Sequence, residues 1–543
     1  MEKSKSTPTR KFNFKFLARS VLLIPALLFL KSTIQVTSSG CIQPEPFNPA
    51  NKSLDNNYQN LTTPTFTLPL FNRFSGAVQI PTVTYDEMIG DYQDPVLFAP
   101  FKDFRKYLQD NYPLVHQLEY HIINEYSLIY IWQGSDVSLK PIMLMAHMDV
   151  VPVDPATVSE WSHPPFSGFV DEKFIWGRGA TDCKGTVIGI IEAVESLLKA
   201  GFTPKRTIIV SFGHDEEISG YHGQQHNVEY IFNRYGADGI EYVLDEGGSI
   251  VASDSFMNTS VIDSSKKESK HFAIIGIAEK GYLDVNITVN INKGGHASIA
   301  PPHTGIGILA EIIVALEDNP HQPELLASNP VLQTLQCINE HTNLLSTWQK
   351  FILHHWQWFK PLILHFAKKN PLTNIFFATT QAADVVKGGV KVNALPQTAS
   401  IFINHRVAMH QSVDQVMDHI YQIVAPIAAK HSLSFLNQTG NAGSVVVGTE
   451  KIEPSPISPT GQSFEEIGSV VKRVFPNTII SPMLMTANTD TRWVWKLTRN
   501  IYRFTPAIIA SDDGIHTVNE RISKSNLVNI VKFYHELVRA STE

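Results

Sequence analysis

The sequence is poor in cysteine and in charge. Its three cysteines, Cys41, Cys183 and Cys337, are too few for a disulfide framework, and no Cys-x-x-Cys pair is present. Charged residues make up 17% of the chain and the formal net charge is -7, which argues against nucleic acid as the main partner. No repeat of the solenoid kind is visible, so a solenoid architecture is excluded as well.

Apolar residues, by contrast, make up 43% of the 543 residues. That is ample for a large core, in a chain too long for one ordinary domain.

The N-terminal segment differs from the rest of the chain. Residues 1–19 carry six basic residues against one acid, and an uninterrupted apolar run follows from Val21 to Leu30. This run is short for a bilayer span of about 20 residues, so a cleaved signal peptide, an uncleaved anchor and a core helix all compete. The basic flank favours targeting, and Lys31 in place of a small-x-small cleavage site favours an anchor. We therefore expect a cytoplasmic tail (1–19), a signal anchor (20–36) and a lumenal remainder, as in a type II membrane protein.

Residues 37–70 are rich in Thr, Asn, Pro and Ser, and we predict an extended stalk there. Glycosylation sequons carry information if the chain enters the secretory route. They occur at Asn51, Asn60, Asn258, Asn286 and Asn437.

Beyond the stalk the pattern predicts an α/β fold, with strands alternating with helices from about residue 98. Strands are expected at 126–132, 141–146, 207–213 and 242–245, and helices at 98–112 and 185–200. Such alternation is typical of a largely parallel sheet with helices on both faces. We assign this domain to residues 71–280 and 441–543.

The pattern changes near Glu279, where a smaller α+β domain is predicted over residues 281–440. Its expected order is β-α-β-β-α-β, with an antiparallel sheet. The elements are a strand at 283–291, a helix at 305–317, strands at 389–392 and 400–405, a helix at 413–430 and a strand at 432–436. The aromatic-rich segment 319–372 reads as a helical insertion. Its apolar stripes could belong to the core, to a surface for a partner or to a membrane contact. Apolar stripes of this kind most often belong to the core.

Polar residues with metal-binding chemistry recur at the ends of the predicted strands. They are His147, Asp149, Asp182, Glu216, Glu217, Asp245 and His516. One such residue means little, because a lone His is usually structural and an acidic pair is usually a solvated turn. Active sites of open α/β sheets, however, collect beyond the carboxyl ends of the strands, where all of these residues are expected.

The chemistry of this set suits two divalent metal ions. Imidazole and carboxylate ligands fit zinc, and Asp182 is the natural bridge between two ions about 3.5–4 Å apart. Asp149 is placed to orient His147, since the second ring nitrogen of a metal-bound His needs an acceptor. Of the adjacent Glu216 and Glu217, one can be a ligand and the other the general base toward the attacking water.

At these residues the sequence resembles the co-catalytic metallopeptidases of the M20 family. The motifs are "WGRGATDCKG", "DEEISG", "NKGGHASIAP" and "VNALP", and "NTDTRWVWKLTRNIYRF" looks closest to the fungal carboxypeptidase S branch. The resemblance runs from about residue 75 to the end. It implies a zinc-peptidase-type mixed sheet flanked by helices, with an inserted lid or dimerisation domain.

The resemblance also implies roles for the individual residues. His147, Asp182 and Asp245 would bind one zinc ion, and Asp182, Glu217 and His516 the other. Glu216 would be the general base and Asp149 would polarise His147. Some family members have Glu at the position of Asp245, and with Glu246 adjacent this ligand stays open. Cys183, next to the bridging Asp, reads as a small buried side chain.

The inserted domain is expected to contribute to substrate binding. The resemblance implies that His296 polarises the scissile carbonyl, in some relatives from a partner subunit, which allows a homodimer. Asn393 and Arg406 match positions that hold polar groups of the substrate. Arg406 reads equally well as an ordinary salt-bridged strand residue.

Three classes of function compete. The first is a zinc carboxypeptidase of the vacuolar lumen that acts on small peptides with a free C-terminus. The second is an N-acyl-amino-acid amidohydrolase or condensing enzyme, because relatives use the same metal centre on such substrates. The third is a receptor or scaffold with a dead metal site, which predicts a missing ligand or base, and none is missing from the sequence.

Overall fold

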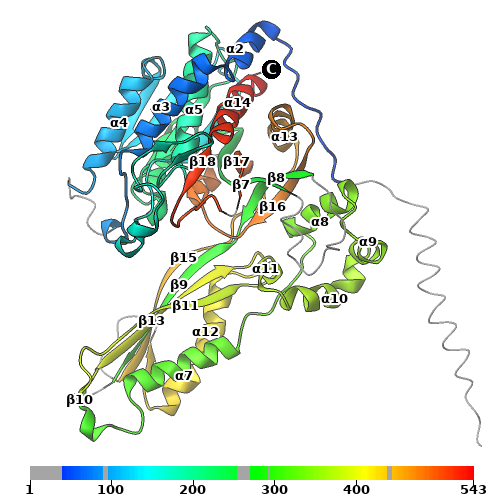
Figure 1. The fold of residues 1–543 in the computed structure, drawn as a ribbon. Coiled ribbons are helices and arrows are strands. Elements are labelled where there is room, and N and C mark those ends of the chain that lie inside the picture. Colours follow the sequence, from blue (N-terminus) through cyan, green and yellow to red (C-terminus); the bar gives the residue numbers. More distant parts are fainter. Residues whose placement is uncertain are drawn as a thin grey trace, which may run out of the picture.

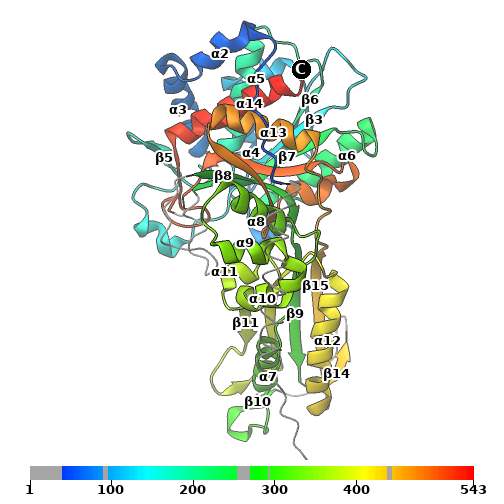
Figure 2. The same cartoon turned by 90° about the vertical axis from the view of Figure 1, so that its right-hand side faces the viewer.

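The computed structural model describes residues 40–89, 96–252, 270–291, 294–436, 443–510 and 512–542. A large α/β domain, the main domain, carries a smaller elongated domain, the inserted domain, that projects from one side (Figures 1 and 2).

The main domain is built on an eight-stranded mixed sheet in the order β1-β2-β6-β3-β7-β17-β8-β16. The strands are β1 Glu119–Ile123, β2 Ser127–Trp132, β3 Ile142–His147, β6 Ile208–Gly213, β7 Tyr242–Ala252, β8 His271–Glu279, β16 Thr478–Met485 and β17 Ile501–Ile508. β3 pairs in parallel with β6 and β7, and every residue of β3 and β6 is buried. Continuous apolar strands of this kind require helices on both faces.

The flanking helices bury their apolar stripes against this sheet. They are α3 Pro64–Val78, α4 Ala99–Asn111, α5 Lys184–Lys199, α6 Gln224–Tyr235, α13 Gln462–Val474 and α14 Lys524–Ala540. The α5 and α14 helices approach closely, because a Cβ at Gly189 would lie 2.3 Å from Cγ2 of Ile530. The expected α/β class with a mixed sheet is confirmed.

The inserted domain has a five-stranded sheet in the order β11-β13-β9-β15-β14. Its elements are β9 Gly281–Asn290, β10 Gly295–His296, α7 Gly305–Asp318, β11 Thr380–Gly388, β12 Ala394–Leu395, β13 Thr398–Val407, α12 Val413–Lys430, β14 Ser434–Leu436 and β15 Ser444–Ile452. Along β9 every second residue is buried, and these residues pack under α7 and α12 in one apolar cluster.

The end of the inserted domain and the position of one of its strands differ from the sequence prediction. The domain ends after β15 at Ile452 rather than at 440, since β15 pairs with β9 along its length. The strand expected at 389–392 lies earlier, at β11, because Gly389 adopts φ +75° and the chain turns there.

The helical insertion predicted at 319–372 forms four helices, α8 Pro330–His341, α9 Thr347–His354, α10 Trp356–Lys368 and α11 Pro371–Asn374. They lie over the edge of the main sheet, near the root of the inserted domain (Figure 2). Thr334 of α8 donates to the carbonyl of Pro482 at 2.7 Å, and Ile338 packs with Ile479 of β16. The insertion therefore covers the edge strand β16, so that strand is not open to pairing.

The prediction of an extended stalk at 37–70 is wrong for residues 40–70. Cys41 forms a disulfide with Cys337 of α8, and α2 (Asp55–Asn60) and α3 follow. Leu61 and Leu70 are fully buried in the main core. The apolar residues of this Thr- and Pro-rich segment therefore pack onto the core of the main domain. Cys183 is buried and free.

The predicted tail (1–19) and anchor (20–36) lie outside the described residues. Within the part of the chain that the structure describes, no helix is long and apolar enough to cross a membrane. Of the sequons, Asn258 and Asn437 also lie outside this part. Asn51 and Asn60 are exposed and Asn286 is half-buried.

Candidate metal centre and active site

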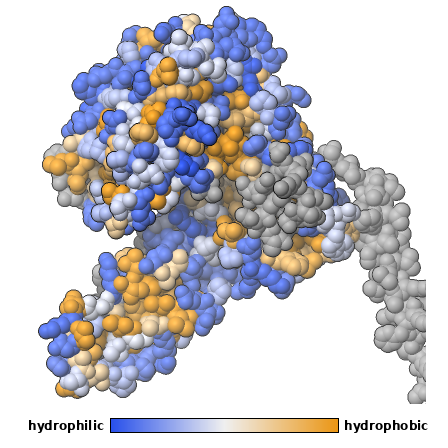
Figure 3. All heavy atoms as spheres, viewed as in Figure 1, coloured by the Kyte–Doolittle hydropathy of each residue, from blue (hydrophilic) through white to orange (hydrophobic). Residues whose placement is uncertain are grey.

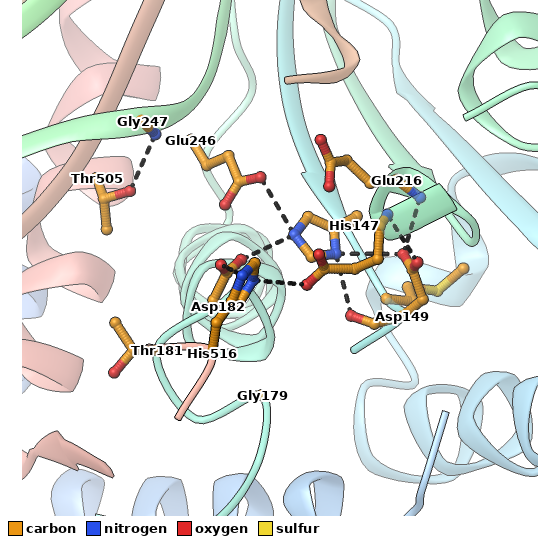
Figure 4. Close-up of polar contacts among 12 residues, drawn as sticks. His147, Asp149, Gly179, Thr181, Asp182, Glu216, Glu246, Gly247, Thr505 and His516 are labelled. Atoms are coloured by element: carbon orange, nitrogen blue, oxygen red, sulfur yellow. Dashed lines mark hydrogen bonds and ion pairs between the residues drawn. The ribbon is translucent and has the colours of Figure 1, made fainter. Parts of the chain in front are cut away.

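Most of the polar residues predicted from the strand ends, though not Asp245, converge beyond the carboxyl ends of central strands of the main sheet (Figure 4). His147, the last residue of β3, points Nε2 at Oδ1 of Asp182, 3.0 Å away. His516, in the loop after β17, points Nε2 at the other oxygen of Asp182, also 3.0 Å away. Asp182 thus offers one oxygen to each His, which is the geometry expected of a bridging carboxylate.

Asp149 holds His147 from the opposite side. Its Oδ1 lies 3.2 Å from Nδ1 of His147, and it accepts hydrogen bonds from Thr84 Oγ1 (2.8 Å) and from the N–H groups of Glu216 and Glu217 (3.1 and 3.0 Å). This fully buried carboxylate therefore fixes both the imidazole and the turn that carries the two glutamates. An outer carboxylate of this kind orients a metal-ligating His and raises its basicity.

The two adjacent glutamates point in different directions, as expected. Glu217 places Oε1 3.2 Å from Nε2 of His516, so it joins the second histidine. Glu216 lies on the other side of His147, where its carboxylate borders the cavity described below (Figure 4).

Glu246, and not Asp245, completes the cluster. Its Oε1 lies 3.1 Å from Nε2 of His147. The structure does not bring Asp245 there, because adjacent residues of β7 point to opposite faces of the strand. Oδ1 of Asp245 accepts the N–H of Glu246 at 2.9 Å, and Oδ2 has no hydrogen-bond partner among the residues that the structure describes. Cys183 also lies beside His147 and Glu246.

The electrostatics of the cluster fit a pair of cations. Burial raises the pKa of Glu216 well above its usual range, and it raises the pKa of Glu217 to about 7. Hydrogen bonds to Asp182 and Glu217 raise the pKa of His516 to about 10. Buried acids this close together cannot all ionise without positive charge between them. Nitrogen and carboxylate donors of this kind fit zinc or a similar divalent ion.

Glu520 supports the loop that carries Asp182, and sequence reasoning missed it. Its buried carboxylate accepts hydrogen bonds from Nη1 of Arg178 and from the N–H groups of Gly179, Thr181 and Asp182, at 2.7–3.2 Å. The sequence offered one signal for Glu520, namely its position four residues after the predicted metal ligand His516.

A cavity of about 550 Å³ opens from this cluster toward the inserted domain. Asp182, Glu216, Glu217, Glu246 and His516 line one side. Tyr282, Arg406, Asn488 and Arg492 are among the residues on the other. Nη1 of Arg406 donates to Oδ1 of Asn488 at 2.8 Å, and the guanidinium lies over the ring of Tyr282. Burial lowers the pKa of Arg406. Arg406 thus faces the cluster, as a substrate-binding residue would.

His296 and Asn393 do not reach this cavity within one chain. Both lie at the far end of the inserted domain, where β10 pairs with β12 and the N–H of Ala297 donates to the carbonyl of Asn393 (Figure 1). His296 is exposed, and its Nδ1 lies 2.7 Å from Oγ of the neighbouring Ser298.

The fold and the metal-type cluster define a metallopeptidase architecture, and sequence comparison agrees with it. Peptidase family M20/M25/M40 matches residues 143–540, and the chain belongs to this family. Over 534 residues the chain is 36% identical to carboxypeptidase S of Saccharomyces cerevisiae, with 92% of this chain and 88% of that protein covered. Over 474 residues it is 35% identical to the N-fatty-acyl-amino acid synthase/hydrolase PM20D1 of Homo sapiens, with 86% of each covered. The chain is therefore a hydrolase of the M20 metallopeptidase family.

Solved structures share the whole architecture. The M20 family metallo-carboxypeptidase Sso-CP2 from Sulfolobus solfataricus aligns with a TM-score of 0.61 at 17% identity, covering 87% of this chain and 98% of its own. The YXEP protein of Bacillus subtilis, described as a dinuclear metal binding peptidase from the M20 family, aligns with a TM-score of 0.51 at 13% identity, covering 88% and 99%. At these identities both comparisons show the fold alone.

Proposed function

We propose that this chain is a carboxypeptidase with two zinc ions that removes the C-terminal residue of small peptides. The observation that carries the proposal is the cavity that joins the carboxylate and histidine cluster to Arg406. Arg406 can bind a carboxylate through two parallel hydrogen bonds. A peptide held by its C-terminal carboxylate would then present its last peptide bond to the cluster.

Each residue of the cluster has a role in this proposal. His147, Asp182 and Glu246 would bind one ion, and Asp182, Glu217 and His516 the other, with Asp149 orienting His147. The bound ions would polarise the attacking water and the scissile carbonyl. Glu216, bordering the cavity without being part of either ligand set, would take a proton from the water and pass it to the leaving amine nitrogen.

A second candidate is hydrolysis or synthesis of N-fatty-acyl amino acids, because PM20D1 of Homo sapiens carries that name at 35% identity. Both substrate classes have a free carboxylate for Arg406. A panel of blocked dipeptides and fatty-acyl amino acids, assayed for kcat/KM, separates the two. We expect the dipeptides to be preferred, and a strong preference for fatty-acyl amino acids would transfer the assignment to the second candidate.

The need for a free carboxylate has its own test. One peptide is assayed as the free acid and as the C-terminal amide, because amidation removes the charge that Arg406 would bind. We expect the amide to be cleaved poorly and Arg406→Ala to narrow the difference. Equal rates on the two forms in the unmodified enzyme would rule out a carboxypeptidase.

A homodimer would bring His296 and Asn393 to an active site. β11 is the edge strand of the inserted sheet, and Val385 and Val386 on it are exposed. A second copy pairing there could direct the tip of its inserted domain at the first copy's cavity. Sedimentation analysis would show a dimer, and His296→Ala would lower kcat.

We further propose a vacuolar location and a type II anchor at residues 20–36. The support is the charge asymmetry of the N-terminus and the likeness to carboxypeptidase S. The Cys41–Cys337 disulfide suits an oxidising compartment such as the secretory route. Glycosidase treatment should shift the gel mobility through Asn51 and Asn60, and the absence of a shift would contradict lumenal exposure.

A further inference from the structure

The helical insertion carries an apolar groove that the proposed catalysis does not use. The groove lies among α8, α9 and α10 and has a volume of about 470 Å³. Leu335, Trp348, Ile352, Leu362 and Phe366 are among its lining residues, and its walls are almost entirely apolar. Figure 2 faces this region directly.

Large aromatic side chains stand at the surface around the groove. Trp348 is 57% exposed, Trp358 is 65% exposed and Phe366 is 50% exposed. Trp358, Leu362 and Phe366 follow one another at intervals of four residues, so they form one stripe along α10. Figure 3 shows apolar residues at the surface of this part of the molecule, beside the root of the inserted domain.

The charge of this segment has one sign. Residues 341–383 contain four lysines and neither Asp nor Glu. Nζ of Lys369 lies 5.7 Å from the ring centroid of Phe366, so a cation borders the groove. Exposed Trp and Phe beside lysines, on an amphipathic helix, are the composition that binds at the interface of anionic lipid bilayers.

The chain enters the described structure at the same place. Cys41 is disulfide-bonded to Cys337 near the end of α8, and its N–H donates to Oε2 of Glu340 at 2.8 Å. Only residues 31–40 separate this bridge from the apolar run that ends at Leu30, a reach of at most about 40 Å. A membrane that held the apolar run would therefore lie within reach of α9 and α10.

A fatty-acyl substrate is a poorer occupant for the groove. The groove and the cavity at Arg406 share no lining residue. The α8 helix stands between the groove and the main sheet, since Thr334 bonds to β16 on one side and Leu335 lines the groove on the other. An acyl chain in the groove would not be continuous with a substrate at the metal cluster.

We propose that the exposed face of α9 and α10, with Trp348, Trp358 and Phe366, docks onto the surface of an anionic lipid bilayer, and that the groove receives lipid acyl chains. The Cys41–Cys337 bridge fixes the membrane-proximal chain to this face. The anchor proposed above then sets not only the attachment of the enzyme but also which side of it faces the membrane. The inference builds on that anchor, and the experiment separates the two.

The test places an environment-sensitive fluorophore at Trp358→Cys in the full chain, in vesicles of phosphatidylcholine and phosphatidylserine. Val137→Cys, which is 83% exposed on the main domain, is the matched control position. We expect doxyl-labelled lipids to quench the label at 358 by more than half and to leave the label at 137 unchanged. Aqueous iodide should quench the two labels in the opposite order.

Other outcomes overturn the proposal. One such outcome is that iodide quenches the label at 358 as strongly as the label at 137 in protein that still floats with the vesicles. That result would contradict docking of this face and leave the proposed anchor unaffected. Shielding of the label at 358 from iodide without any quenching by doxyl-labelled lipids, at all protein concentrations, means that the chain's own N-terminal segment fills the groove. Shielding that depends on protein concentration means that a second copy covers the face.

A second variant guards against misfolding. Trp348→Ser combined with Phe366→Ser should abolish lipid quenching of a label at 358 while kcat/KM on a soluble substrate stays unchanged. Val137→Ser should change neither property. Lipid quenching that persists in the double variant would also overturn the proposal.

Discussion

Arg178 and Glu520 are 342 residues apart in the chain, yet Nη1 of the arginine donates to Oε2 of the glutamate at 2.7 Å with both side chains buried. The same carboxylate accepts three backbone N–H groups, from Gly179 to Asp182. The position of Asp182 therefore depends on a residue near the end of the chain.

Glu520→Gln should destabilise the protein and weaken metal binding. The amide lacks the charge that Arg178 needs, and its NH₂ group would face N–H donors. Loss of one partner of a buried ion pair costs about 3–5 kcal/mol. Chemical denaturation measures the loss. Asp512→Asn is the control, because Asp512 forms an exposed pair with Arg521, and such pairs contribute at most about 1 kcal/mol. Similar losses in both variants would mean that Glu520 has no special role.

Glu216→Gln should keep the metal content and lose about 100- to 10,000-fold in kcat, the usual contribution of a general base. The amide has nearly the same shape but cannot accept the proton. Glu217→Gln should instead lower the metal content, because Glu217 contacts His516. Metal analysis and kcat are measured on each variant. A reversed pattern would exchange the two roles.

Glu246→Gln should reduce the bound metal by about one ion per chain, whereas Asp245→Asn should retain both ions. The reason is geometric, since Glu246 faces His147 and Asp245 bonds to the N–H of Glu246. Elemental analysis after dialysis measures both variants. If Glu246→Gln kept its metal and Asp245→Asn lost it, Asp245 would be the ligand, as the family resemblance implies.

The inserted domain should lose stability as the pH falls below about 6.5, the usual pKa of histidine. Burial lowers the pKa of His321 to about 3 and that of His405 to about 4. Because these folded-state values lie below the unfolded value, the unfolded chain binds more protons between about pH 6.5 and pH 4, and acid favours unfolding.

At pH 5 the loss is about 2 kcal/mol for each of the two histidines. His321→Phe and His405→Phe remove the titrating rings, so each variant should show a smaller fall in Tm between pH 7 and pH 5. An unchanged fall in both variants would show that other groups control the acid response.

Several elements were predictable from sequence because their signals are local. The α12 helix begins and ends where expected, since Ser412 and Gln415 form a capping box and the apolar spacing is regular. The convergence of His147, Asp182 and His516 followed from the rule for strand ends in α/β sheets.

Other features depend on non-local contacts that no local signal records. The helices α2 and α3 were missed because Pro64 and Pro69 in a polar segment resemble a linker, although Pro64 stands at the first helical turn, where proline is tolerated. The bond between Cys41 and Cys337 joins residues 296 positions apart. The choice between Asp245 and Glu246 depended on which face of β7 meets the cluster, and sequence leaves that open.

The place of β17 in the main sheet has a consequence for how the enzyme is made. β17 lies between β7 and β8, although more than two hundred residues separate it from them along the chain. A ribosome therefore delivers every strand and helix of the inserted domain before the strand that completes the main sheet. His516 and Glu520 follow β17 and are synthesised later still. A centre that includes His516 and Glu520 cannot assemble before both residues have been made, so the order of translation keeps the growing protein inactive up to that point.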